Sequence, residues 1–285
     1  MKKTKIKYTR APFLSWIILP ILGVLLATNY IFGLTRRPTW AIIYDNDPSS
    51  ANLESVTSPS SEEKADIEWN GEGLITFWFD DAWISQYAVA FPILKKSGFP
   101  AALAVPTSAI NWDGYMTWAQ IKRVKYNGWE ITAHSRSHEC DLIKLNHDKL
   151  VDELAGSQMD LLEKGYKTDI YVEPCGVGNE ELIKTAKDYY LSLRTTEEGL
   201  NSIPLADPYS LKIVEVGNNT NLKDIENWVN QAKISKSWLI IMFHKIEETG
   251  YEYTTPTSTL ESIVNTISKS GLRVVLPSQA LNINK

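Results

Sequence analysis

The chain has 285 residues and a formal net charge of −5, from 29 basic and 34 acidic residues. This length allows one or two domains with a sizeable core. The mildly acidic balance, without a clustered basic face, excludes a typical nucleic-acid-binding protein, so we expect no nucleic-acid partner.

The N-terminal part of the sequence predicts a membrane anchor. Basic residues at positions 2, 3, 5, 7 and 10 precede an uncharged, mostly apolar stretch from Ala11 to Leu34. This stretch is long enough to cross a bilayer as a helix. The basic residues before it outnumber Arg36 and Arg37 after it, so we expect the N-terminus inside and the bulk of the chain outside. Because no convincing small-residue cleavage site follows, a retained signal anchor is favoured over a cleaved signal peptide.

The composition then divides the rest of the chain into a linker and a folded domain. From about Asp45 to Gly73 the sequence is polar and contains serine, proline and charged clusters that offer little apolar surface to bury. We therefore expect a cytoplasmic tail at 1–10, a single-pass anchor in the cell membrane at 11–34, an extracytoplasmic linker at 35–73 and an extracytoplasmic domain at 74–285.

Within that domain, short apolar runs alternate with segments of helical spacing. We expect strands at Leu74–Phe79, Ala101–Val105, Trp129–Ala133, Asp169–Val172, Tyr189–Leu193, Leu239–Phe243 and Leu272–Leu276. Helices are expected at Ile84–Lys96, Thr117–Asn127, Asp148–Lys164, Glu180–Lys187, Leu222–Ile234 and Thr259–Lys269. Apolar strands alternating with helices indicate a parallel sheet covered on both faces. The predicted fold class is α/β, with about seven βα units that favour an incomplete or distorted (β/α) barrel preceded by one transmembrane helix, although periodicity alone does not separate a barrel from an open sheet.

Unusual polar residues follow several of these strands. In a βα barrel the carboxyl ends of all strands meet at one rim, which is where the chemistry takes place. Asp80 and Asp81 follow the first predicted strand, His134 the third, Pro174-Cys175-Gly176 the fourth, Arg194 the fifth and His244 the sixth. These side chains should therefore converge on one site.

Two of the motifs have the composition of a metal centre. His134 and His138 stand at i and i+4, where they can share one face of a helical turn as metal-ligand pairs often do. A single histidine is more often an ordinary hydrogen-bonded ring, but the pair with an acidic pair on the same rim favours a site. Together with Asp80 and Asp81 the histidines supply three ligands and a nearby base, which predicts a metal-dependent hydrolase. His147, at a predicted helix start, is interpreted as structural.

The two cysteines, Cys140 and Cys175, both lie within a few residues of these motifs. Two cysteines rule out a disulfide-dense scaffold. We expect two unpaired buried thiols, with a bridge near the site as the alternative.

These motifs resemble those of a known family, the polysaccharide deacetylases that share the NodB homology domain, also called carbohydrate esterase family 4. The resemblance covers about residues 74–276. In that family a Thr-Phe-Asp-Asp-Gly segment supplies a base and a metal ligand, and a His-Ser/Thr-x-x-His segment supplies two more ligands. The resemblance implies that Asp80 is the base and that Asp81, His134 and His138 bind the metal, while Ala82 stands in place of the glycine.

The third family motif, Arg-x-Pro-Tyr-Gly, appears here as Val172-Glu173-Pro174-Cys175-Gly176. The resemblance implies that the Cys175 N–H donates to an oxyanion. The arginine that pairs with the base is absent at Val172, and the sequence does not tell whether this reduces activity. Arg194 is our candidate for that role, with a solvated strand-end arginine as the equal alternative. The last motif, an apolar strand ending in histidine, matches His244, which would protonate the leaving amine.

The resemblance implies a metal-dependent hydrolase that removes N-acetyl groups from amino sugars of a cell-wall or extracellular polysaccharide. Zinc is the expected metal, although cobalt, nickel or manganese also suit such ligands. One alternative is a catalytically impaired, membrane-anchored glycan-binding protein, which the missing arginine and the alanine at Ala82 favour. Others are an O-acetyl esterase with the same centre and an amidase on a non-glycan substrate. The sequence names neither the glycan nor the oligomeric state.

Overall fold

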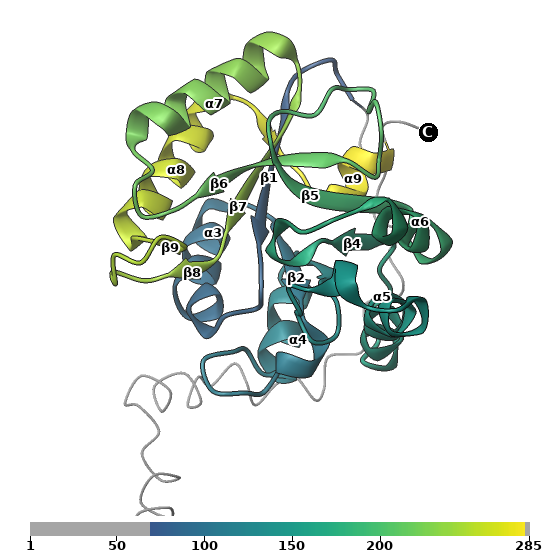
Figure 1. The fold of residues 1–285 in the computed structure, drawn as a ribbon. Helices are drawn as coiled ribbons and strands as arrows, with labels where there is room; N and C mark the ends of the chain where they lie inside the picture. The colour runs from purple at the N-terminus through teal and green to yellow at the C-terminus, as the bar shows by residue number, and fades with distance from the viewer. Residues whose placement is uncertain (1–68, 283–285) are drawn as a thin grey trace, which may run out of the picture. The chain divides into compact units, whose positions relative to one another are not determined.

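The computed structural model describes residues 69–282 (Figure 1). Among the helices in this range, none combines the length and the apolar character needed to cross a membrane. The predicted tail at 1–10 and anchor at 11–34 lie outside the described residues, as does the linker at 35–73 except for its last five positions.

The strands form one parallel sheet that closes on itself. Their order is β10-β1-β2-β3-β4-β5-β6-β7, and β1 also pairs with β7. The strands of this sheet are β1 (Leu74–Phe79), β2 (Ala102–Val105), β3 (Glu130–Ala133), β4 (Ile170–Val172), β5 (Ser192–Glu198), β6 (Leu211–Val216), β7 (Trp238–Phe243) and β10 (Arg273–Val274). Two further short strands, β8 (Lys245–Ile246) and β9 (Thr254–Thr255), pair with each other. The closure confirms the predicted barrel rather than an open sheet.

The last strand, β10, makes the barrel irregular beside β1. Along one edge, β1 pairs with β7 over its whole length. Along the other edge it pairs with β10 through Leu74 and Ile75, and with β2 through Trp78 and Phe79. The last strand is therefore inserted between β1 and β2 at the amino end of the barrel, and it is shorter than the predicted run at 272–276.

Helices cover the outside of the barrel (Figure 1). They are α3 (Phe91–Ser97), α4 (Trp118–Tyr126), α5 (His147–Glu163), α6 (Glu180–Tyr189), α7 (Leu222–Ser235), α8 (Thr257–Ser270) and α9 (Pro277–Asn282). The predicted helix at 84–96 is a π-helical turn, Gln86–Ala90, followed directly by α3. Local sequence sets the ends: Thr117 and Gln120 form a capping box before α4, and Gly98 ends α3 in a left-handed conformation with φ 71°.

Strand alternation creates an inner and an outer core. Because successive side chains of a strand point to opposite faces, β1 directs Ile75, Phe77 and Phe79 towards the helices, whereas Leu74 and Trp78 belong to the inner cluster. Continuing this alternation past the end of β1 directs the next even-numbered side chain, Asp80, towards the barrel interior. The site therefore begins where the apolar interior ends.

Two strands differ from the predicted ones. Tyr189 still belongs to α6, so β5 begins at Ser192 and continues to Glu198. Arg194 accordingly lies inside β5 rather than after it. The strand β6 was not predicted, because Lys212 and Glu215 interrupt its apolar run.

Candidate active site at the carboxyl rim of the barrel

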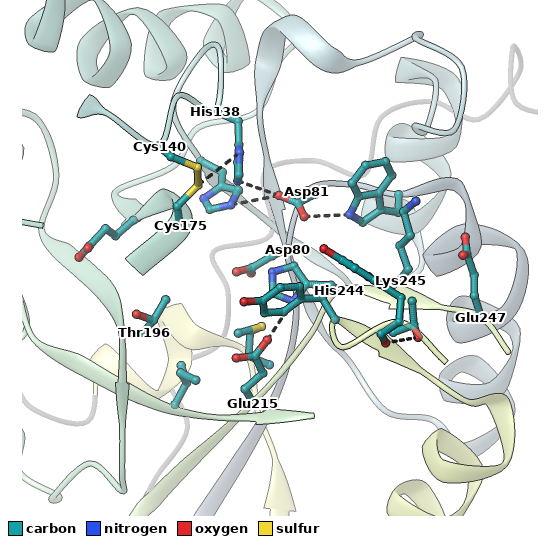
Figure 2. A pocket seen from close by; sticks show the side chains of 18 of the residues that line it. Asp80, Asp81, His138, Cys140, Cys175, Thr196, Glu215, His244, Lys245 and Glu247 are labelled. Atoms are coloured by element: carbon teal, nitrogen blue, oxygen red, sulfur yellow. Dashed lines mark hydrogen bonds and ion pairs between the residues drawn. A yellow bond between two sulfur atoms is a disulfide. The ribbon is translucent and has the colours of Figure 1, made fainter. Parts of the chain in front are cut away.

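A cavity of about 900 Å³ opens at the carboxyl ends of the barrel strands (Figure 2). This volume lies in the range of small-molecule sites. Among the side chains that line it are six of the seven predicted site residues: Asp80, Asp81, His134, His138, Cys175 and His244. The seventh, Arg194, is fully buried and contacts Asp80. The structure thus brings all seven together.

Three of these side chains meet at one point. Asp81 Oδ1 lies 3.0 Å from His138 Nε2 and 3.4 Å from His134 Nε2. Within the described part of the chain, these ligand atoms all lie within 4.8 Å of one another. Burial by itself raises the pKa of Asp81, but the two imidazoles outweigh it and hold this pKa well below its ordinary value. The carboxylate is therefore ionised at neutral pH.

The hydrogen bonding of His134 shows that this group suits a cation. His134 Nδ1 lies 2.9 Å from the carbonyl oxygen of Val172. A carbonyl oxygen only accepts, so Nδ1 carries the hydrogen and a neutral ring has a lone pair on Nε2. That lone pair faces Asp81 Oδ1, which is buried and has no hydrogen-bond partner in residues 69–282. Two acceptors that face each other need a positive charge between them. In addition, a backbone partner on the other ring nitrogen, here Nδ1, is typical of metal-bound histidine. The donor set Asp/His/His fits a divalent metal such as zinc.

The loops that carry these ligands have unusual backbone conformations. Asp81, Ala82, Ser135 and His138 all have positive φ, between 57° and 75°. Such conformations cost about 1–3 kcal/mol each and concentrate at functional sites. The predicted helical turn for the histidine pair is wrong: residues 134–138 form a loop, closed by a hydrogen bond from the His138 N–H to Ser135 Oγ (2.9 Å). Ala82, where the family has glycine, still adopts the left-handed conformation.

Asp80 is held by a buried ion pair. The Arg194 guanidinium donates to Asp80 Oδ2 and lies with its central carbon 5.5 Å from the centre of the Trp78 ring. The other oxygen, Oδ1, is buried without a hydrogen-bond partner among the described side chains. One oxygen is therefore fixed and the other is available to accept a proton. The alternative of a solvated strand-end arginine is wrong, because Arg194 is fully buried.

His244 faces a second carboxylate. Its Nδ1 lies 3.4 Å from Glu215 Oε1, an ion-pair distance without the geometry of a good hydrogen bond (Figure 2). Burial lowers the pKa of His244, but Glu215, Asp80 and Asp81 together outweigh burial and raise it above the ordinary value. The imidazolium form thus persists to higher pH than in a free histidine.

Two further residues tie the loops of the candidate site together. The Gln86 side chain donates to the carbonyl of Asp80 and to the carbonyl of His244 (2.9 Å), and so links the ends of β1 and β7. Trp83 Nε1 donates to Asp81 Oδ2 (2.8 Å), and its ring stacks on Tyr115. Both residues orient groups that were predicted to be functional.

The cysteine prediction is wrong. Cys140 and Cys175 form a disulfide, with their Cα atoms 5.3 Å apart, and both are exposed. The bridge joins the loop after β3 to the loop after β4, and Cys175 Sγ lies 4.0 Å from His138 Nδ1 (Figure 2). The loop Pro174–Gly176 follows β4 as predicted, with Cys175 at φ 56°.

Sequence reasoning missed Glu215, Gln86 and Trp83. Glu215 has a usable signal, because the run 211–216 is rich in β-branched and apolar residues and is bounded by Pro208-Tyr209-Ser210 and Gly217-Asn218. Gln86 and Trp83 lie in an ordinary helical pattern, and only the folded loop reveals their hydrogen bonds. No role was predicted for Glu173, the second residue of the third motif. In the structure it lines the cavity, and burial outweighs the opposing effect of Arg194 and raises its pKa to about 7.

Comparisons with known proteins agree with these motifs. Residues 68–193 match the family model described as polysaccharide deacetylase. The protein YxkH of Bacillus subtilis (strain 168), whose name assigns it to the polysaccharide deacetylases, is 31% identical over 134 residues, which are 46% of this chain and 47% of that protein. The chain thus matches about half the length of this curated relative.

Solved structures share the fold. The peptidoglycan deacetylase PdaC of Bacillus subtilis has a TM-score of 0.53 and 19% identity, over 76% of this chain and 93% of that one. The family 4 carbohydrate esterase domain of a xylanase from the Trinervitermes trinervoides hindgut metagenome has a TM-score of 0.54 and 17% identity, over 73% and 89%. The deacetylase PplD of Streptococcus pyogenes has a TM-score of 0.51 and 24% identity, over 66% and 78%. At these identities the likeness concerns the fold.

The family match spans the Asp80-Asp81 and His134 to His138 motifs and ends one residue before Arg194. By this match and the motifs it contains, residues 68–193 are similar to the polysaccharide deacetylase family.

Proposed function

We propose that the domain is a metal-dependent hydrolase that removes N-acetyl groups from amino sugars of a cell-wall or extracellular polysaccharide. The observation that carries the proposal is the buried Asp81 Oδ1, which lies 3.0 and 3.4 Å from two imidazole nitrogens and has no partner of good hydrogen-bond geometry in the described part of the chain. Asp80 and His244 line the same cavity, so a base and an acid stand beside the ligand group.

Two residues of the chain carry out the proton transfers, one as a base and one as an acid. A divalent metal held by Asp81, His134 and His138 would supply a Lewis acid that acidifies water and polarises an acyl carbonyl. Asp80, with Oδ1 free, accepts the proton of the attacking water. The Cys175 N–H donates to the developing oxyanion. His244, kept protonated by its acidic neighbours, donates a proton to the nitrogen of the leaving amine. The products are acetate and a free amine.

The glycan-binding alternative loses support from two observations. The missing motif arginine is matched by Arg194, which contacts Asp80 from β5. Ala82, at the position of the family's glycine, adopts a positive φ, a conformation that glycine takes readily. A protein that only binds glycans does not need a base held by an arginine or a ligand loop kept in this conformation, so both observations favour hydrolysis.

The test is acetate release by the purified full-length chain. We expect turnover of an N-acetylglucosamine oligomer to exceed that of an O-acetylated xylan oligomer, and to fall on the order of 100-fold or more in Asp80→Asn. Asp188→Asn on the exposed face of α6 is the matched control and should leave the rate unchanged. Metal binding without acetate release from either substrate would support the glycan-binding alternative, and preferential release from the ester would support the esterase.

We also propose that residues 11–34 anchor the domain in the cell membrane, with the domain extracytoplasmic. The basic residues before the apolar stretch support this orientation. Protease added to intact cells should then remove the domain, whereas protection of the domain would contradict the proposal.

A further inference from the structure

The two histidines of the ligand group are held very differently. His134 is buried, and its Nδ1 is fixed by the backbone carbonyl of Val172. The side chain of His138 is 30% exposed, and its Nδ1 faces the disulfide sulfur Cys175 Sγ at 4.0 Å. In metal sites the far nitrogen of a ligating histidine almost always has such an outer partner. For His138 the group that lies against this nitrogen is the disulfide sulfur of Cys175, at 4.0 Å.

The disulfide is also one of two anchors of the His138 loop. On the β3 side, the backbone N–H groups of Arg136 and Ser137 both donate to Glu153 of α5, and the Arg136 guanidinium pairs with Asp160. Gly156 makes room for that guanidinium, since a Cβ there would lie 2.6 Å from its Nε. The second anchor lies beyond His138.

That second anchor is the Cys140–Cys175 bridge, which ties the far side of the loop to the loop after β4. His138 stands between the two anchors with φ 59°. A non-glycine residue keeps such a conformation only when its surroundings enforce it. Cutting the bridge releases this anchor and frees Cys175 Sγ from its fixed position beside His138.

We propose that the Cys140–Cys175 disulfide is a positioning element of the metal centre, which holds His138 as a ligand and makes metal binding sensitive to thiol reductants. This inference rests on the proposed function, because it presumes that Asp81, His134 and His138 bind a metal. Both cysteines are exposed, so a small dithiol has access to the bridge. In the reduction the S–S bond breaks, two cysteine thiols form, and the dithiol loses two electrons and two protons to become a cyclic disulfide.

The experiment measures Zn²⁺ affinity of the full-length chain by competition with a chromogenic chelator. Oxidised wild type is compared with wild type that has been reduced with a dithiol and then desalted under argon, so that no reductant competes for zinc. We expect reduction to weaken Zn²⁺ binding by about tenfold or more, the range for losing an outer partner of a metal ligand. The double variant Cys140→Ser/Cys175→Ser should bind zinc like reduced wild type and should not respond to dithiol.

Several results would overturn the proposal. Equal Zn²⁺ affinity before and after reduction, with only a lower melting temperature, assigns the bridge a purely structural role. A thiolate absorption band in the Co²⁺-loaded reduced protein shows that the cysteines themselves become ligands. Acetate release by the oxidised protein is measured in parallel. Its absence with zinc bound refutes the proposed hydrolysis, while the Zn²⁺ comparison still decides the role of the bridge.

Discussion

The pair formed by His244 and Glu215 sets the charge of the predicted acid. Glu215 and the site aspartates raise the pKa of His244 against the opposing effect of burial. A proton donor loses activity as pH rises through its pKa, so the raised value keeps the acid competent to higher pH. In Glu215→Gln the attraction is removed, the pKa of His244 falls, and the alkaline limb of the kcat/KM profile moves to lower pH. Lys212→Met, which breaks only the exposed ion pair with Glu197, is the control. An alkaline limb unmoved by Glu215→Gln would contradict this role.

Glu173 predicts a pH dependence of stability. Burial raises its pKa to about 7, whereas an unfolded glutamate titrates near 4.3. The folded state therefore holds the proton more tightly, and this contribution to stability is present below the unfolded pKa and lost as pH rises towards 7. The glutamine in Glu173→Gln does not titrate, so the variant does not lose this contribution as pH rises. The free energy of unfolding of the variant minus that of wild type should therefore be larger at pH 8 than at pH 4 by on the order of 1–3 kcal/mol. Urea unfolding of wild type and Glu173→Gln at pH 4 and pH 8 measures the difference in free energy of unfolding between them. An equal difference at the two pH values would contradict this prediction.

At the scale of elements, the π-helical turn after β1 couples the two ends of the site. Gln86 is fully buried and donates to carbonyls at the ends of β1 and β7. Gln86→Met leaves both carbonyls without this donor, which should lower stability by about 1–3 kcal/mol and also reduce kcat. Gln158→Met is the matched control, because Gln158 likewise donates to two backbone carbonyls, those of Thr168 and Tyr189, away from the cavity. It should lose stability but keep kcat. Equal kcat losses in both variants would contradict a coupling specific to the site.

Among the strands, the sequence predicts best those whose residues all face apolar surroundings. The strand β1, buried on both faces, was predicted with its observed bounds. The strands β5 and β6 were shifted or missed because their carboxyl halves rise into the polar cavity, where Thr196 and Glu215 replace apolar residues. The loops were less predictable still, since a positive φ at Ser135 or His138 depends on contacts with distant segments. The seven candidate site residues could be predicted to lie together because strand ends meet at one rim, whereas the disulfide partner of Cys140 depended on a loop 35 residues away.

At the scale of the whole molecule, the barrel brings distant parts of the chain to one rim. The loop after β1 supplies the predicted base and one predicted metal ligand, and the loop after β3 supplies two more predicted ligands. Arg194 comes from β5, and the predicted acid follows β7. Closure through β1 and β7 places Asp80 beside His244, with the Asp80 N–H donating to the carbonyl of Phe243 (2.9 Å). An open sheet would separate these two strands by its full width. The chemistry proposed for this chain therefore depends on closure.

Metal-dependent acetate release tests this chemistry most directly. The full-length chain is stripped with a chelator, dialysed and assayed on an N-acetylglucosamine oligomer before and after one equivalent of Zn²⁺ is added. We predict that the stripped protein releases no acetate above background and that Zn²⁺ restores release in wild type, but not in a variant with both His134→Ala and His138→Ala. Full acetate release by the metal-free protein, or restoration by Zn²⁺ without these histidines, would contradict the proposed centre.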